Sequence, residues 1–118
     1  MKKYIQGEKV KFSIQLGTKD KNEVFKALDL TGNTEIQVVF KTGSTVIKKN
    51  RVASPVGVVV LGALTEGKIE ATLTAAETET QPKTADGLIE IVVTYPSSDI
   101  KKFQIAKAFS VALKADAT

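Results

Sequence analysis

The chain is dominated by runs in which apolar and polar residues alternate. A period of two predicts β-strands with one dry face and one wet face. The clearest run, residues 8–16, reads EKVKFSIQL, so every second side chain from Val10 to Leu16 is apolar. Alternating or β-branched runs recur at residues 35–41, 45–49, 56–61, 68–73, 88–95 and 100–113. We therefore predict seven strands.

Turn signals separate the runs. Residues 17–26 are polar and predict an exposed loop, and residues 81–87 predict another. In LDLTG, residues 28–32, we expect both leucines to point inward while Asp29 points outward or accepts bonds from nearby backbone amides. Short turns are predicted at residues 41–44, where Gly43 favours a hairpin, and at residues 96–99.

Three segments depart from simple alternation. Residues 74–77, TAAE, have the spacing of a capping box and predict one helical turn. Lys107 stands where the last strand requires an apolar residue, which predicts a bulge at residues 106–108 that releases the lysine to water. Residues 56–61, VGVVVL, suit either a core strand of this chain or an edge strand that meets a partner.

Seven short strands with one helical turn predict an all-β fold, namely an antiparallel β-sandwich of immunoglobulin-like type. Parallel α/β folds need recurring helices, and the pattern contains none. The length of 118 residues fits one domain. We assign residues 7–113 to the sandwich, residues 1–6 to an N-terminal arm and residues 114–118 to a C-terminal tail.

The composition removes most catalytic chemistries. The chain has no cysteine and no histidine, so thiolate nucleophiles, disulfides, serine–histidine pairs and the commonest zinc sites are excluded. The five aspartates are far apart in the sequence, unlike those of a calcium loop. Glu35, Glu70 and Glu90 fall on outward strand positions and are interpreted as surface residues. We therefore expect no enzymatic activity, no cofactor and no metal site.

The formal net charge of +4 raises the question of nucleic-acid binding. Of the 17 basic residues only Arg51 is an arginine, and the lysines are scattered, so the pattern favours a solvated surface. The longest uncharged segment, residues 52–65, is shorter than the roughly 20 residues of a membrane helix. The N-terminus lacks the features of a secretion signal, so we expect the chain to be made and kept in a cytoplasm or to leave it by lysis.

Several segments together resemble a known family. They are GEKVKFSIQL at residues 7–16, LDLTG at residues 28–32, VVFK at residues 38–41, GKIEATLTAAET at residues 67–78, DGLIEIVV at residues 86–93 and FQI at residues 103–105. This series resembles the small immunoglobulin-like domains of tailed-phage virion proteins, in particular the N-terminal domain of baseplate upper proteins. Those proteins continue into helical and receptor-carrying regions, whereas this sequence ends at Thr118.

The resemblance implies a non-enzymatic structural component of a bacteriophage virion, assembled in the host cytoplasm. A baseplate or tail accessory protein and a head-decoration protein both remain open. Its partners would be other phage structural proteins and further copies of the chain in a symmetric assembly. The expected contacts involve the N-terminal arm, residues 56–61 and the C-terminal segment. The candidate interface residues are Tyr4, Ile5, Val56, Val58, Val60, Phe109, Val111 and Leu113.

A second hypothesis is a host-surface or carbohydrate-binding adhesion module. Sugar-binding modules usually display exposed aromatic side chains, and the chain has no tryptophan. Tyr4 and Phe25 are the aromatic residues that the strand pattern does not assign to a core face, so they carry this alternative.

Overall fold

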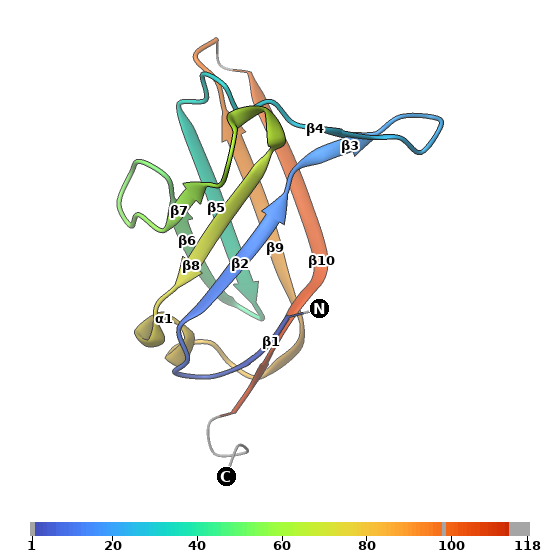
Figure 1. The fold of residues 1–118 in the computed structure, drawn as a ribbon. Helices are drawn as coiled ribbons and strands as arrows, with labels where there is room; N and C mark the ends of the chain where they lie inside the picture. Colours follow the sequence, from blue (N-terminus) through green and yellow to red (C-terminus); the bar gives the residue numbers. More distant parts are fainter. Residues whose placement is uncertain (1, 98, 114–118) are drawn as a thin grey trace.

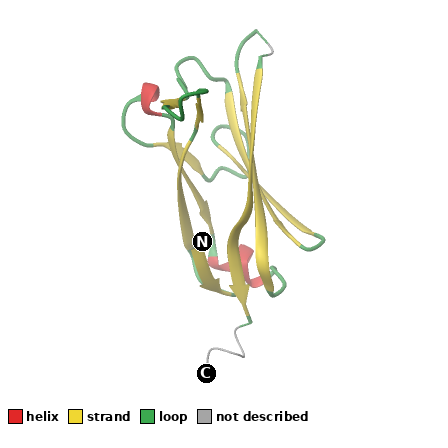
Figure 2. Ribbon diagram, turned by 90° about the vertical axis from the view of Figure 1, so that its right-hand side faces the viewer, coloured by secondary structure: helices red, strands yellow, loops and turns green. Residues whose placement is uncertain are grey.

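The computed structural model describes residues 2–97 and 99–113, which form a two-layer β-sandwich (Figures 1 and 2). The larger sheet has the order β1-β10-β9-β5-β6 and the smaller sheet has the order β2-β8-β7. The strands of the larger sheet are β1 (Lys2–Ile5), β10 (Ile100–Ala112), β9 (Thr84–Thr94), β5 (Glu35–Thr42) and β6 (Thr45–Asn50). Those of the smaller sheet are β2 (Val10–Gln15), β8 (Lys68–Leu73) and β7 (Val58–Val60).

Four further elements lie outside these two sheets. Strands β3 (Gly17–Lys19) and β4 (Phe25–Ala27) pair as a hairpin that projects from the body (Figure 1). A short 3₁₀ helix, η1 (Leu64–Glu66), precedes β8, and helix α1 (Ala75–Glu79) follows it. The predicted all-β sandwich is confirmed. Its strands are distributed between the two sheets as in immunoglobulin folds. Strands β2, β8 and β7 take the positions of strands B, E and D.

The core between the sheets is built around four aromatic rings. Phe12 of the smaller sheet lies with its ring centroid 5.1 Å from that of Phe40 and 5.7 Å from that of Phe109, both of the larger sheet. Tyr4 stacks on Phe109 at 5.7 Å. All four side chains are buried, so each contributes about 1.5–3 kcal/mol through burial of apolar surface.

The predicted bulge in the last strand is confirmed. Pairing between β10 and β9 shifts between Ile105 and Phe109, and Lys107 has a φ of 53° with an exposed side chain. The shift returns Phe109 to the core, where its ring packs against the backbone of Gly87. A side chain at Gly87 would overlap that ring, so the bulge and the glycine form one packing unit.

The N-terminal segment corrects one prediction. Residues 2–5 form strand β1, which pairs in parallel with residues 109–112 of β10, so they belong to the sheet rather than to a separate arm. The Tyr4 hydroxyl donates a hydrogen bond to Gln81 Oε1 at 2.6 Å inside the protein. Four residues are too few to show alternation, and for this reason the strand was missed. The sandwich is therefore not wholly antiparallel.

The predicted corner and capping box are both confirmed. Asp29 Oδ1 accepts a hydrogen bond from the Thr31 amide at 2.9 Å, and Gly32 supplies the positive φ of 78° that the turn needs. At α1, Thr74 Oγ1 accepts from the Glu77 amide at 3.2 Å, while Glu77 Oε1 accepts from the Thr74 amide at 2.8 Å. The predicted loop at residues 17–26 instead contains the β3–β4 hairpin.

Candidate docking surface at strand β7

The predicted interface residues do not form one surface. Four of them, Tyr4, Val58, Phe109 and Val111, are buried in the core of this chain. The prediction that these side chains reach a partner is wrong, because inward-facing strand positions were chosen and those positions fill the space between the two sheets. The predicted tail, residues 114–118, lies outside the described residues.

The other four predicted residues lie at two separate places. Ile5 is half-buried in β1, and Leu113 is exposed just after β10. Val56 is exposed and Val60 is half-buried, and both line a surface hollow beside β7. The structure therefore brings only the third predicted contact, residues 56–61, into a surface that a partner could cover.

Three exposed apolar side chains form a surface at strand β7 that we call the β7 patch: Val56 just before β7, Val59 of β7 itself and Leu64 of η1. Their exposed fractions are 58%, 50% and 43%. They surround a hollow of about 470 Å³ whose remaining lining is Leu30, Gly32, Asn33, Arg51, Val58 and Val60. Sequence reasoning missed Val59 and Leu64. The alternation of side chains along a strand could have indicated Val59: if Val58 and Val60 point into the core, Val59 between them must point to solvent.

The loop before β7 is held by one carboxylate. Glu35 Oε1 accepts hydrogen bonds from the Arg51 and Val52 amides, each at 2.9 Å, and Glu35 Oε2 accepts from the Ala53 amide at 2.9 Å. Burial works to raise the pKa of Glu35, but these bonds outweigh it and hold the pKa below its ordinary value. The sequence interpretation of Glu35 as a plain surface residue therefore overlooked its structural role.

Arg51 borders the hollow in a fixed orientation. Its Nε donates to Asn33 Oδ1 at 2.9 Å, and its guanidinium also donates to the Asn33 carbonyl oxygen at 3.2 Å. Arginine is enriched in protein–protein interfaces, and a side chain already held in place loses little freedom when a partner binds. The only arginine of the chain thus lies beside its β7 patch.

Strand β7 is also an edge of the smaller sheet. The Thr72 amide donates to the Gly57 carbonyl and the Leu61 amide donates to the Lys68 carbonyl, each at 2.9 Å. Hydrogen bonds alternate along an antiparallel pair, so the backbone groups of Val58 and Val60 point away from β8. The patch consequently combines exposed apolar side chains with an open strand edge.

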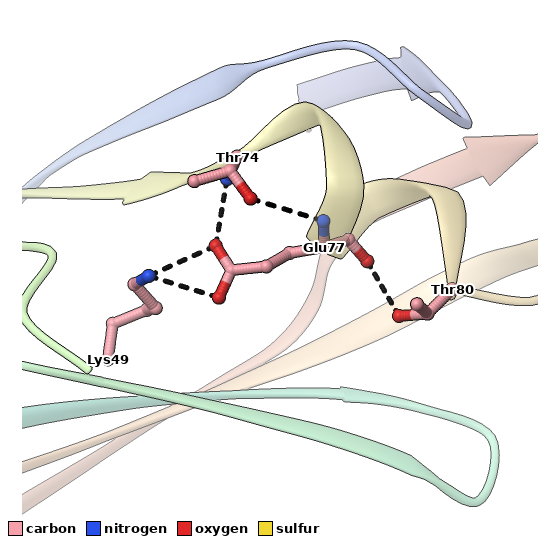
Figure 3. Close-up of polar contacts among 4 residues, drawn as sticks. All are labelled: Lys49, Thr74, Glu77 and Thr80. Atoms are coloured by element: carbon pink, nitrogen blue, oxygen red, sulfur yellow. Dashed lines mark hydrogen bonds and ion pairs between the residues drawn. The ribbon is translucent and has the colours of Figure 1, made fainter. Parts of the chain in front are cut away.

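A partly buried ion pair joins β6 to α1 (Figure 3). Lys49, at the end of β6, has a side chain only 6% exposed, and its Nζ lies 3.0 Å from each carboxylate oxygen of Glu77 in α1. Burial works to raise the pKa of Glu77, but bonds from the Thr74 amide and from Lys49 hold the pKa below its ordinary value. Glu77 therefore stays ionised near neutral pH, and its contact with Lys49 joins α1 to the larger sheet.

Within residues 2–97 and 99–113, no group of three or more acidic side chains is arranged to hold a metal ion. Over the same residues, no helix has the length and apolar character needed to cross a membrane.

Comparisons with known proteins add no functional information. No family model matches the chain, and no curated protein matches its sequence. A solved structure of murine CRIg aligns with 95% of this chain and 90% of its own chain, at 8% sequence identity and a TM-score of 0.40. Likeness at that level supports no argument, so the description of the fold rests on the strand order and register given above.

Proposed function

We propose that this chain is a non-enzymatic structural component of a tailed-phage virion that docks onto other subunits through the β7 patch. The observation that carries the docking role is the cluster of Val56, Val59 and Leu64 at an open strand edge. The virion assignment rests on the resemblance of the sequence to virion domains. A baseplate, tail or head-decoration position is compatible with the docking role and with the resemblance.

The physical argument for docking concerns water. Isolated exposed apolar residues are common on soluble proteins, but a cluster around a hollow is typical of an interaction surface. Covering Val56, Val59 and Leu64 would remove apolar area from water, and the open edge of β7 offers backbone groups to an added strand. A symmetric particle repeats such contacts, which strengthens the attachment of each copy.

The proposal is tested by the amount of this chain in purified particles of the phage that encodes it. We expect the wild-type chain in particles and at least a tenfold loss of incorporation for Val59→Asp, since a carboxylate in a covered apolar contact is strongly unfavourable. Val46→Asp is the matched control, because Val46 on β6 is also 50% exposed. Equal incorporation of both variants, or absence of the wild-type chain from particles, contradicts the proposal.

A second candidate function is adhesion to a host-surface glycan, and one observation favours it. Phe25 lies on the projecting β3–β4 hairpin and is 45% exposed, which offers part of its ring for stacking on a sugar. Glycan-array binding by the isolated protein that disappears in Phe25→Ala would support adhesion. No binding by the wild-type protein would remove this alternative.

A further inference from the structure

The two layers of the sandwich are open along one side. Strand β1 pairs with β10 only at residues 109–112, so residues 100–105 of β10 pair with β9 on one side and with no strand on the other within the described chain. The base of the β3–β4 hairpin lies near Lys101 and Phe103 at the upper end of this stretch. Strand β2 is likewise the outer strand of the smaller sheet. We call the opening between β2 and this part of β10 the seam. Figure 1 shows both strands on the same side of the molecule.

The seam has an apolar floor and a basic rim. It encloses a hollow of about 570 Å³ lined by Lys2, Lys11, Phe12, Ser13, Ile14, Ile89, Ile105 and Ala108. Ile14, Ile105 and Ala108 are only half-buried, although they pack against the core. This is the incomplete burial expected where a sandwich lacks a strand along its side.

The backbone along both sides of the seam is available for pairing. The Tyr95 amide donates to the carbonyl of Asp99, which lies opposite it, at 2.9 Å. Hydrogen-bonded and non-hydrogen-bonded pairs alternate along an antiparallel pair of strands, so the backbone groups of Lys102 and Gln104 point away from β9. On the opposite side, the Leu16 amide donates to the Gly67 carbonyl at 2.7 Å, which directs those of Lys11 and Ser13 away from β8. An extended chain in the seam would therefore meet unused donors and acceptors.

The charges around the seam select the occupant. The lining includes two lysines and no carboxylate among its side chains. Lys11 Nζ lies 3.9 Å from Glu70 Oε1 on β8, and its side chain remains 58% exposed. Lys2 Nζ lies 5.8 Å from the centre of the Phe12 ring, at the entrance to the hollow. Lys102 and Lys107 are exposed further along β10. An acidic segment would be attracted to this rim.

We propose that the seam binds an acidic, extended segment of a neighbouring protein subunit, which adds a strand beside β10 with its apolar side chains on Ile14, Ile105 and Ala108. This inference deepens the proposed docking function and rests on it. A nucleic acid fits less well, because single strands are recognised by exposed stacking aromatics, whereas the floor here is largely aliphatic. A peptide matches both the strand edges and the floor.

The test is a titration of the isotope-labelled protein, followed by the NMR signals of its backbone amides. The probe is an eight-residue peptide alternating aspartate and valine, and the comparison peptides replace aspartate by asparagine or by lysine. We expect the acidic peptide to bind at least tenfold more tightly than either, to shift the signals of Ser13, Lys102 and Gln104, and to bind more weakly as salt is added.

Matched charge reversals locate the binding. The double variant Lys2→Glu with Lys11→Glu should weaken binding of the acidic peptide at least tenfold. The double variant Lys21→Glu with Lys48→Glu makes the same change in net charge away from the seam and should weaken binding less than twofold. If the first pair disturbs the fold, the amide map and peptide discrimination of the wild-type protein still decide the question.

Three results would overturn the inference: equal affinity for the three peptides, shifts confined to β7, or equal losses in the two double variants. Preferential binding of an oligonucleotide at the same amides would also overturn it. The titration uses isolated protein without particles, so its failure is distinct from a failure of Val59→Asp to reduce incorporation, which concerns the proposed function.

Discussion

Removing either member of the ion pair between Lys49 and Glu77 should lower the stability of the protein, but by unequal amounts. Removing the Glu77 side chain leaves the Lys49 ammonium without its carboxylate partner, in a side chain that is only 6% exposed. Removing the ammonium instead leaves Glu77, which is 24% exposed and still accepts the Thr74 amide. We therefore expect Glu77→Ala to destabilise the protein far more than Lys49→Met does.

The magnitudes follow from the environment of each group. Stranding a buried charge costs about 3–5 kcal/mol, and loss of the capping box adds about 1 kcal/mol for Glu77→Ala. Lys49→Met keeps an unbranched stem beside Gly57, so it should cost no more than about 1 kcal/mol. The double variant should be more stable than Glu77→Ala alone, because no unpaired ammonium remains in it.

Urea unfolding followed by circular dichroism and by the fluorescence of Tyr4 and Tyr95 measures these differences. With a slope of about 1.5 kcal/mol per molar urea, a loss of about 4 kcal/mol, the lower end of the range for Glu77→Ala, lowers the midpoint by about 2.7 M. Glu77→Gln is the control, since glutamine also forms capping boxes. Equal effects of Glu77→Ala and Lys49→Met, or a double variant less stable than Glu77→Ala, would refute the reasoning.

Three further predictions concern positions elsewhere in the fold. Gly87→Ala should destabilise by about 1–3 kcal/mol in urea, because the added methyl overlaps the Phe109 ring; an unchanged midpoint would contradict this packing. Glu35 has a lowered pKa, so its stabilising contribution is present above the unfolded-state pKa of about 4.3 and is lost as the pH falls through the folded-state pKa. The stability advantage of the wild type over Glu35→Gln should accordingly shrink in acid, and an advantage that grows in acid would exclude the bonding described. Tyr4→Phe should cost about 1–3 kcal/mol, since it leaves Gln81 Oε1 without its buried donor, and a neutral effect would argue against that bond.

Much of the architecture could be predicted because one face of most strands is dry. Alternation located the strands with inward Phe12, Phe40 and Ile91, and the misplaced Lys107 located the bulge. The capping box at residues 74–77 was visible as well, since its bonds lie within four residues. Signals of this kind are local and need no knowledge of the tertiary structure.

The missed features depend on contacts between distant residues. Strand β1 has four residues, and its pairing with β10 crosses nearly the whole chain. The structural role of Glu35 arises from amides 16–18 residues away. The candidate interface failed for a related reason. Apolar residues such as Val111 were assigned to an interface with a partner, but the second sheet of this chain already covers them.

The two proposed surfaces lie at different strand edges and differ mainly in their charged residues. Both combine apolar side chains with an open strand edge, but the β7 patch lies beside a fixed arginine and the seam has a lysine rim. A neighbour could occupy one without the other. Variants at Val59 and at Lys11 therefore report on separate contacts.

The central claim is that the β7 patch contacts another subunit in an assembled particle. The most direct measurement places a photoreactive amino acid at position 59 and, as the control, at position 46, then identifies cross-linked proteins in purified particles by mass spectrometry. The account predicts cross-links from position 59 to another virion subunit and few from position 46. Particles that contain the chain but give no cross-link from position 59 would contradict it.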